Sequence, residues 1–188
     1  MNGFLIRPAI VEDAPAIAEI HHRGWLLAYS DFIGEGSIGA KAPDQRLAYW
    51  QGRIADPACI VLTGATSSGN VMGMVYGGVV LPHDITEGSI DAFDSELYIL
   101  HCRQEVQGKG LGRDLTGALA ERLQRQGKTS LVLWAFKDNA FRRFYDRLGG
   151  EIVAEGHEDG ITDVAYGWRD IGTLIAACKG ATHTARTA

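Results

Sequence analysis

The stretch Gln107-Gly108-Lys109-Gly110-Leu111-Gly112 decides the fold class, because it joins two segments that the sequence marks clearly. Residues 96–103, ELYILHCR, form an apolar run that is typical of a strand. Leu111, Leu115, Leu119 and Leu123 then recur every four residues and predict a helix that ends near Gly127. A strand, a glycine turn and a helix in this order place backbone amides at a positive helix end, which favours binding of a phosphate group.

Two better-known phosphate-binding patterns are excluded by counting. A Walker A loop would need glycine at the position of Arg103 and Ser or Thr at that of Gly110. A dinucleotide fingerprint that starts at Gly108 would need Gly or Ala where Arg113 stands. Glycines at a turn also have a purely structural use, since they allow a positive φ. The turn alone therefore leaves both readings open.

The remaining segments supply alternating strands and helices around this turn. The predicted strands cover residues 4–7, 59–63, 71–80, 96–103, 131–136, 152–154 and 164–168, and the predicted helices cover residues 12–29, 44–54, 111–127 and 139–148. Residues 64–70 read as a hairpin connection, while 31–43 and 82–94 read as loops. This order predicts an α/β chain of the α+β type: one domain with a mixed, mostly antiparallel sheet and a parallel central strand pair flanked by helices.

Composition narrows the functional classes. With 188 residues, 46% of them hydrophobic and 22% charged, the chain suits one soluble globular domain. A formal charge of −5 argues against nucleic-acid binding. No apolar run approaches the roughly 20 residues that span a bilayer, and the first residues do not resemble a signal peptide, so we expect a cytoplasmic protein without a membrane partner. Cys59, Cys102 and Cys178 are too scattered for a disulfide framework or a zinc site, so we expect no metal.

The glycine turn and its surroundings resemble the GNAT superfamily of acetyl-CoA-dependent N-acetyltransferases. Residues 107–112 match the pattern [Gln/Arg]-x-x-Gly-x-[Gly/Ala], and residues 96–106 look like the strand and turn that precede it. Residues 134–139 (WAFKDN) and 143–149 (RFYDRLG) are similar to the strand and helix that follow it. The family often has Pro at the position of Gln104 and an aromatic residue at that of Val106. The resemblance covers residues 4–170 and implies a C-terminal tail at 171–188.

The resemblance implies acetyl-CoA as cosubstrate, with direct attack of an amine on the thioester in a ternary complex. The turn from Gln107 through Gly108, Lys109, Gly110, Leu111 and Gly112 would hold the pyrophosphate with its amides, and Lys109 and Arg113 would add charge unless they are simply solvated. The strand residues Leu100, His101 and Cys102 would pair with pantetheine. Asn139 would hydrogen-bond the cofactor, cap a helix, or do both.

Two residues carry the chemistry that the resemblance implies. Tyr145 matches the family's general acid, which protonates the leaving thiolate; its alternative is a packed aromatic on an amphipathic helix. Glu96 matches a carboxylate that accepts the amine's proton directly or through water; its alternative is a surface carboxylate at a strand end. His101 has the better intrinsic pKa for a base, but strand alternation puts positions 96 and 101 on opposite faces. Cys102 has no partner base that would make it a nucleophile.

The acceptor is the least determined part. We expect a small-molecule amine, with an amino group of a protein or peptide, or a non-catalytic acyl-CoA-binding module, as the alternatives. Trp25, Tyr29 and the two loops at 31–43 and 82–94 would border the acceptor. Acidic side chains in these loops favour a cationic acceptor if they form a rim, or only solvate the loops. The loop acids are Asp31, Glu35, Asp84, Glu87, Asp91 and Asp94, with Lys41 and His83 as the basic-type side chains. Dimers are common in the family, so a homodimer is compatible with the resemblance.

Overall fold

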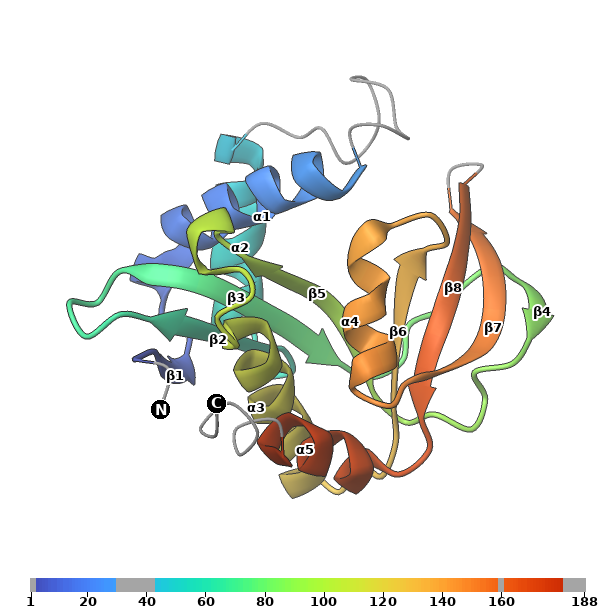
Figure 1. The fold of residues 1–188 in the computed structure, drawn as a ribbon. Helices are drawn as coiled ribbons and strands as arrows, with labels where there is room; N and C mark the ends of the chain where they lie inside the picture. The colour runs from blue at the N-terminus through green and yellow to red at the C-terminus, as the bar shows by residue number, and fades with distance from the viewer. Residues whose placement is uncertain (1–2, 30–42, 159–160, 181–188) are drawn as a thin grey trace. The chain divides into compact units, whose positions relative to one another are not determined.

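The computed structural model describes residues 3–29, 43–158 and 161–180 (Figure 1). Its strands form one mixed sheet in the order β1-β2-β3-β5-β6-β8-β7-β4. Strands β5 and β6 are parallel, with Glu96 opposite Val132, and the pairs β1–β2, β2–β3, β6–β8, β7–β8 and β4–β7 are antiparallel. The predicted fold class is therefore confirmed.

Most elements follow the predicted order. The strands are β1 (Leu5–Pro8), β2 (Ile60–Ala65), β3 (Val71–Gly78), β4 (Ile85–Gly88), β5 (Glu96–Cys102), β6 (Leu131–Phe136), β7 (Glu151–Glu158) and β8 (Ile161–Trp168). The α-helices in the described chain are α1 (Ala14–Tyr29), α2 (Pro43–Ala55), α3 (Leu111–Arg125), α4 (Arg143–Arg147) and α5 (Ile171–Gly180). Short 3-10 turns precede α1 at Val11–Asp13, follow β5 at Gln104–Val106 and precede α4 at Ala140–Arg142.

The chain divides into two compact units, of which the first comprises residues 1–77 and 99–115. It holds the antiparallel strands β1 to β3, the end of β5, helices α1 and α2 and the first turn of α3. Trp50 of α2 is fully buried and packs edge-on against Tyr76 of β3, with ring centroids 5.6 Å apart. Arg7 of β1 forms a bidentate ion pair with the buried Asp13, which anchors the start of α1.

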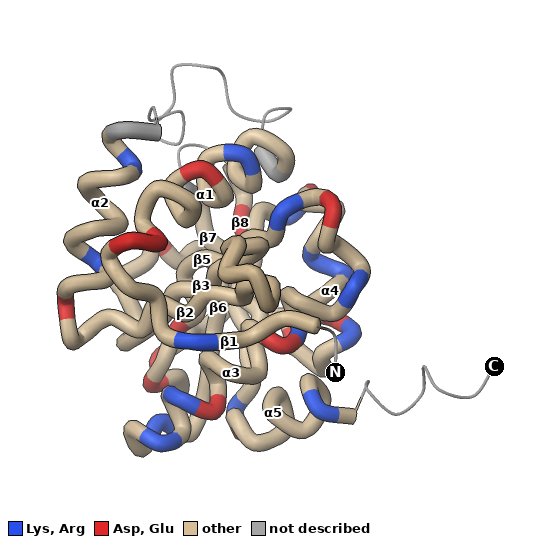
Figure 2. Tube along the Cα trace, turned by 90° about the vertical axis from the view of Figure 1, so that its left-hand side faces the viewer, with Lys and Arg blue, Asp and Glu red and all other residues tan. Residues whose placement is uncertain are grey.

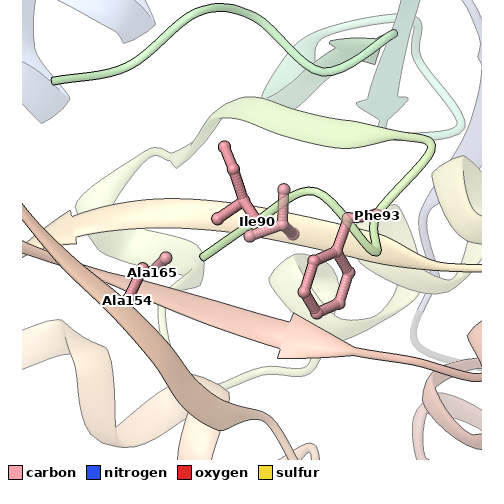
Figure 3. Close-up of a cluster of buried hydrophobic side chains, with 5 residues drawn as sticks. Ile90, Phe93, Ala154 and Ala165 are labelled. Carbon is pink, nitrogen blue, oxygen red and sulfur yellow. The ribbon is translucent and has the colours of Figure 1, made fainter. Parts of the chain in front are cut away.

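The second unit comprises residues 78–98 and 116–188. It holds the start of β5, strands β4 and β6 to β8, the rest of α3, and helices α4 and α5. Strand β6 is almost wholly buried, as its continuous apolar sequence predicts. Ile90 and Phe93 pack onto Val132, Ala154 and Ala165, so the segment before β5 covers one face of this part of the sheet (Figure 3).

Two expectations about elements need correction. Strand β4 lies inside the predicted loop 82–94 and pairs antiparallel with β7. Its residues are mostly exposed and include a glycine, so no apolar alternation marks it. Helix α5 lies inside the predicted tail 171–188, where Ile171, Leu174, Ile175 and Cys178 are buried at helical spacing. Residues 181–188 of that tail lie outside the described residues, and the domain limits 4–170 stay a prediction.

Candidate active site

The glycine turn belongs to the first unit and has the backbone that only glycine adopts easily. Gly108 has a φ of 73° and Gly110 a φ of 89°. The side-chain amide of Gln107 donates a hydrogen bond to the carbonyl of Cys102 at 3.4 Å, which ties the turn back to β5. The amide of Asp114 donates to the carbonyl of Gly110 at 3.0 Å, so α3 begins directly after the turn. Gln107, Gly108 and Lys109 are exposed.

The start of α3 packs closely against glycines of two strands. A Cβ on Gly64 of β2 would lie 2.4 Å from Cδ1 of Leu111, and one on Gly73 of β3 would lie 3.0 Å from its Cδ2. The absence of side chains there lets the first turn of α3 approach the sheet. The helix N-terminus and its partial positive charge are thereby fixed beside residues 107–110.

The charged residues of the turn differ in exposure. Lys109 is exposed, whereas Arg113 is partly buried and lies 3.4 Å from the carboxylate of Asp114. The Nε of Arg113 is buried and has no hydrogen-bond partner within the described residues. Figure 2 shows Lys and Arg distributed among Asp and Glu on several elements of both units.

The end of β5 places His101 in a cluster of rings and a cation in the first unit. His101 stacks on His21 of α1 at 5.6 Å between ring centroids. Arg46 of α2 is buried and its Nη1 lies 3.1 Å from His21, whose Nδ1 also accepts from Trp50 Nε1. Burial, and then the charge of Arg46, lower the pKa of His101 to about 4. His101 is therefore neutral at physiological pH and a weak base there.

The other predicted cofactor residues of β5 lie beside His101. Leu100 and Cys102 are partly buried. The thiol of Cys102 lies close to Gly73, where a Cβ would be 2.9 Å from its sulfur. Burial raises the pKa of Cys102 to about 12, so this thiol is not activated as a nucleophile.

Glu96, at the start of β5, belongs to the second unit and is buried. Its Oε2 accepts a hydrogen bond from the backbone amide of Leu81 at 2.9 Å. The Nε2 of His83 lies 3.0 Å from both carboxylate oxygens. Burial raises the pKa of Glu96, and the hydrogen bonds from Leu81 and His83 oppose that shift. Glu96 is therefore buried and is not a surface carboxylate at a strand end, which was the alternative to a functional role.

Sequence reasoning placed His83 in a loop and did not predict its contact with Glu96. Its ring packs against Trp134 of β6 at 4.9 Å between centroids, and its charge acts on the buried Asp163 of β8. Trp134 Nε1 and Asp163 Oδ1 are buried and lack a hydrogen-bond partner within the described residues. No local pattern in Val79-Val80-Leu81-Pro82-His83 marks this approach to Glu96.

Asn139 and Tyr145 also belong to the second unit. Asn139 is the predicted helix cap: its Oδ1 accepts from the amide of Phe141 at 2.9 Å. Tyr145 in α4 is partly buried, and its ring lies 5.7 Å from that of Tyr166 in β8. The carbonyl of Tyr145 accepts from the amide of Gly150, which ends the short helix. Neither position tests the cofactor or acid role, so both roles stay predictions.

Only some of the acidic side chains in the two predicted loops are exposed and unengaged enough to form a rim around an acceptor. Asp84 and Glu87 are exposed. The carboxylate of Asp91 accepts from Ser89, and that of Asp94 accepts from Thr129 and Ser130. Asp31, Glu35 and Lys41 lie outside the described residues, as does the side chain of Tyr29.

Two classes of feature are missing from the described chain. No group of three His, Cys, Asp or Glu side chains in its described ranges could hold a metal ion. None of its described helices is both long enough and apolar enough to cross a bilayer.

Comparison with known proteins finds similarity to N-acetyltransferases. Residues 72–157 match the family model described as FR47-like protein. The chain is 26% identical over 173 residues to the uncharacterized N-acetyltransferase YuaI of Bacillus subtilis (strain 168), covering 90% of this chain and 95% of that protein. It is 29% identical to the L-methionine sulfoximine/L-methionine sulfone acetyltransferase of Pseudomonas paraeruginosa (strain DSM 24068 / PA7), covering 80% and 81%.

A solved structure agrees with this fold. The PaiA N-acetyltransferase of Thermoplasma acidophilum, in complex with coenzyme A, superposes with a TM-score of 0.68 at 16% identity, covering 88% of this chain and 99% of that one. The glycine turn, the mixed sheet and these matches agree. The chain is similar in sequence and in fold to N-acetyltransferases of the GNAT family, and these matches support an acyltransferase.

Proposed function

We propose that this protein transfers the acetyl group of acetyl-CoA to a small-molecule amine by direct attack in a ternary complex. The observation that carries the proposal is the turn after β5, where Gly108 and Gly110 have left-handed backbone and lead directly into α3. Such a turn directs amides and a helix N-terminus at an anion, which suits the pyrophosphate of a coenzyme.

The first unit would bind the coenzyme. Residues 107–112 would hold the pyrophosphate through their backbone, with Lys109 and Arg113 adding positive charge nearby. Leu100, His101 and Cys102 would offer their backbone to pantetheine as an additional strand. The low pKa of His101 keeps that side chain uncharged beside a neutral thioester arm.

The second unit would carry the proton transfers. Tyr145 would give its hydroxyl proton to the sulfur as the carbon–sulfur bond breaks. Glu96 would draw off, directly or through an intervening group, the proton that the ammonium group must lose before its nitrogen can attack, because an alkylammonium titrates near 10.4. Asn139 would hydrogen-bond the coenzyme while it caps the turn before α4.

A small-molecule acceptor is supported by the relative whose name specifies methionine sulfoximine and methionine sulfone. The two alternatives are an amino group of a protein or peptide, and binding of an acyl-CoA without catalysis. These alternatives differ in what is acetylated, so one assay separates them.

The test is thiol release from acetyl-CoA with a mixed library of small amines, followed by mass spectrometry of the products. We expect thiol release that depends on an amine and a matching N-acetylated small molecule. Acetylation confined to peptides would favour the first alternative. Measured binding of acetyl-CoA without transfer to any amine or peptide would favour the second.

A further inference from the structure

The segment from β3 to His83 is fixed on β5 by three hydrogen bonds within the second unit. The hydroxyl of Tyr98 donates to the carbonyl of Val79. The amide of Leu81 donates to Glu96 Oε2 at 2.9 Å, and His83 Nε2 lies 3.0 Å from both Glu96 oxygens. His83 is thus held by its neighbours before any ligand arrives.

This pairing sets the proton positions on the imidazole. An ionised carboxylate only accepts hydrogen bonds, so Glu96 takes one from Leu81 and one from His83. Nε2 of His83 then carries the proton, and Nδ1 of the neutral ring keeps its lone pair. Nδ1 is therefore the atom of the ring that can receive a proton from a substrate.

Exposure separates the two members of the pair. The side chain of Glu96 is 4% exposed, whereas that of His83 is 23% exposed. Glu96 is buried and already accepts from two donors, so an ammonium group reaches the imidazole more readily than the carboxylate. The charged groups that face His83 from the elements around it are the carboxylates of Glu96 in β5 and Asp163 in β8, and Trp134 of β6 packs against the ring.

We infer that His83 is the base that takes the proton of the acceptor ammonium, and that Glu96 is a positioning residue that acts through it. The inference rests on the proposed acetyl transfer. The ammonium gives one proton to Nδ1 of His83, and the neutral nitrogen attacks the thioester carbon. The carbon–sulfur bond breaks as Tyr145 protonates the sulfur. The phenolate then takes the second proton from the new amide nitrogen, and His83 releases its proton to solvent.

The test compares His83→Ala with His157→Ala, a control histidine on the exposed part of β7 in the same unit. We expect turnover of His83→Ala to fall by about 10²-fold, with acetyl-CoA affinity unchanged and with activity partly restored by imidazole added to the medium. His157→Ala should keep its activity and gain nothing from imidazole. Equal turnover in His83→Ala and the wild type, with chemistry rate-limiting, would overturn the inference.

Glu96→Gln tests the positioning role. The neutral amide of Gln cannot offset the positive charge of an imidazolium. We therefore expect kcat to fall and its pH profile to change on the acid side, while KM for acetyl-CoA stays constant. A fall in kcat without any change in the pH profile would overturn the positioning role. An inactive wild-type protein that binds acetyl-CoA would instead contradict the proposed function, and the two failures are therefore distinguishable.

Discussion

His101 in the first unit and His83 in the second have surroundings of opposite charge. His101 stacks on His21 beside the buried cation of Arg46, and burial together with that cation lowers its pKa to about 4. His83 instead contacts the carboxylate of Glu96 and acts on that of Asp163. The same residue type is kept neutral in one unit and is prepared to accept a proton in the other. The comparison suggests that coenzyme binding rests mainly on the first unit and proton transfer on the second.

The largest effect is expected in the binding region. Gly110→Glu adds a side chain at a φ of 89° and a negative charge beside the predicted pyrophosphate position, so calorimetry should detect no binding of acetyl-CoA. Gly69→Glu is the matched control, since Gly69 has the same φ of 89° in the exposed β2–β3 hairpin. It should bind acetyl-CoA like the wild type. Normal affinity in a folded Gly110→Glu variant would remove the coenzyme from the glycine turn.

The next effect concerns the second unit. Tyr145→Phe keeps the ring beside Tyr166 and removes the hydroxyl. If Tyr145 protonates the thiolate, turnover should fall by about 10²-fold with unchanged acetyl-CoA affinity. Steady-state kinetics and calorimetry on the same preparation measure both quantities. A variant that loses affinity rather than turnover would place Tyr145 with the binding residues and break the division.

A smaller effect tests the packing that confines His101. A Cβ on Gly24 of α1 would lie 2.4 Å from Nδ1 and 2.6 Å from Cγ of His101, so Gly24→Ala should lower the free energy of unfolding by about 1–3 kcal/mol. Gly52 of α2 has no atom within 4 Å of such a Cβ, and Gly52→Ala should raise stability by about 0.5–1 kcal/mol. Denaturant unfolding measures both. Equal stabilisation by the two substitutions would show that His101 is not confined.

The smallest effect concerns acceptor charge. Asp84 and Glu87 are exposed near His83 in sequence, so a rim that attracts cations would include them. The double change Asp84→Asn with Glu87→Gln should reduce the preference for cationic amines over amino acids in kcat/KM by about 2- to 5-fold at low salt. Acetyl-CoA affinity should not change. A wild-type preference for anionic acceptors would end this expectation.

The sequence predicts the helices and strands of this molecule better than its functional contacts. Leucine at every fourth position fixes α3, and an unbroken apolar run fixes β6, because both patterns report burial directly. Helix α5 was missed although Ile171, Leu174, Ile175 and Cys178 follow the helical period. Strand β4 has no such period, because it is exposed and is stabilised by pairing with β7.

The candidate site also has a part that the sequence predicts and a part that it does not. The glycine turn is a local pattern, so its residues could be named from the sequence. The contact of His83 with Glu96 joins residues 13 positions apart through the path of an irregular segment, and no local pattern encodes that path. The low pKa of His101 also depends on its burial and on Arg46, and His21 stacks on its ring; both residues come from helices distant in sequence.

The most direct test of the division between the two histidines is the pH dependence of kcat, measured side by side for His83→Gln and His101→Gln. With a pKa of about 4, His101 changes protonation well below neutral pH, so its substitution cannot remove a titration on the acid side of neutrality. The account predicts that His101→Gln keeps the pH profile of the wild type, and that His83→Gln lowers kcat and changes that profile. A wild-type profile in His83→Gln together with a changed profile in His101→Gln would contradict it.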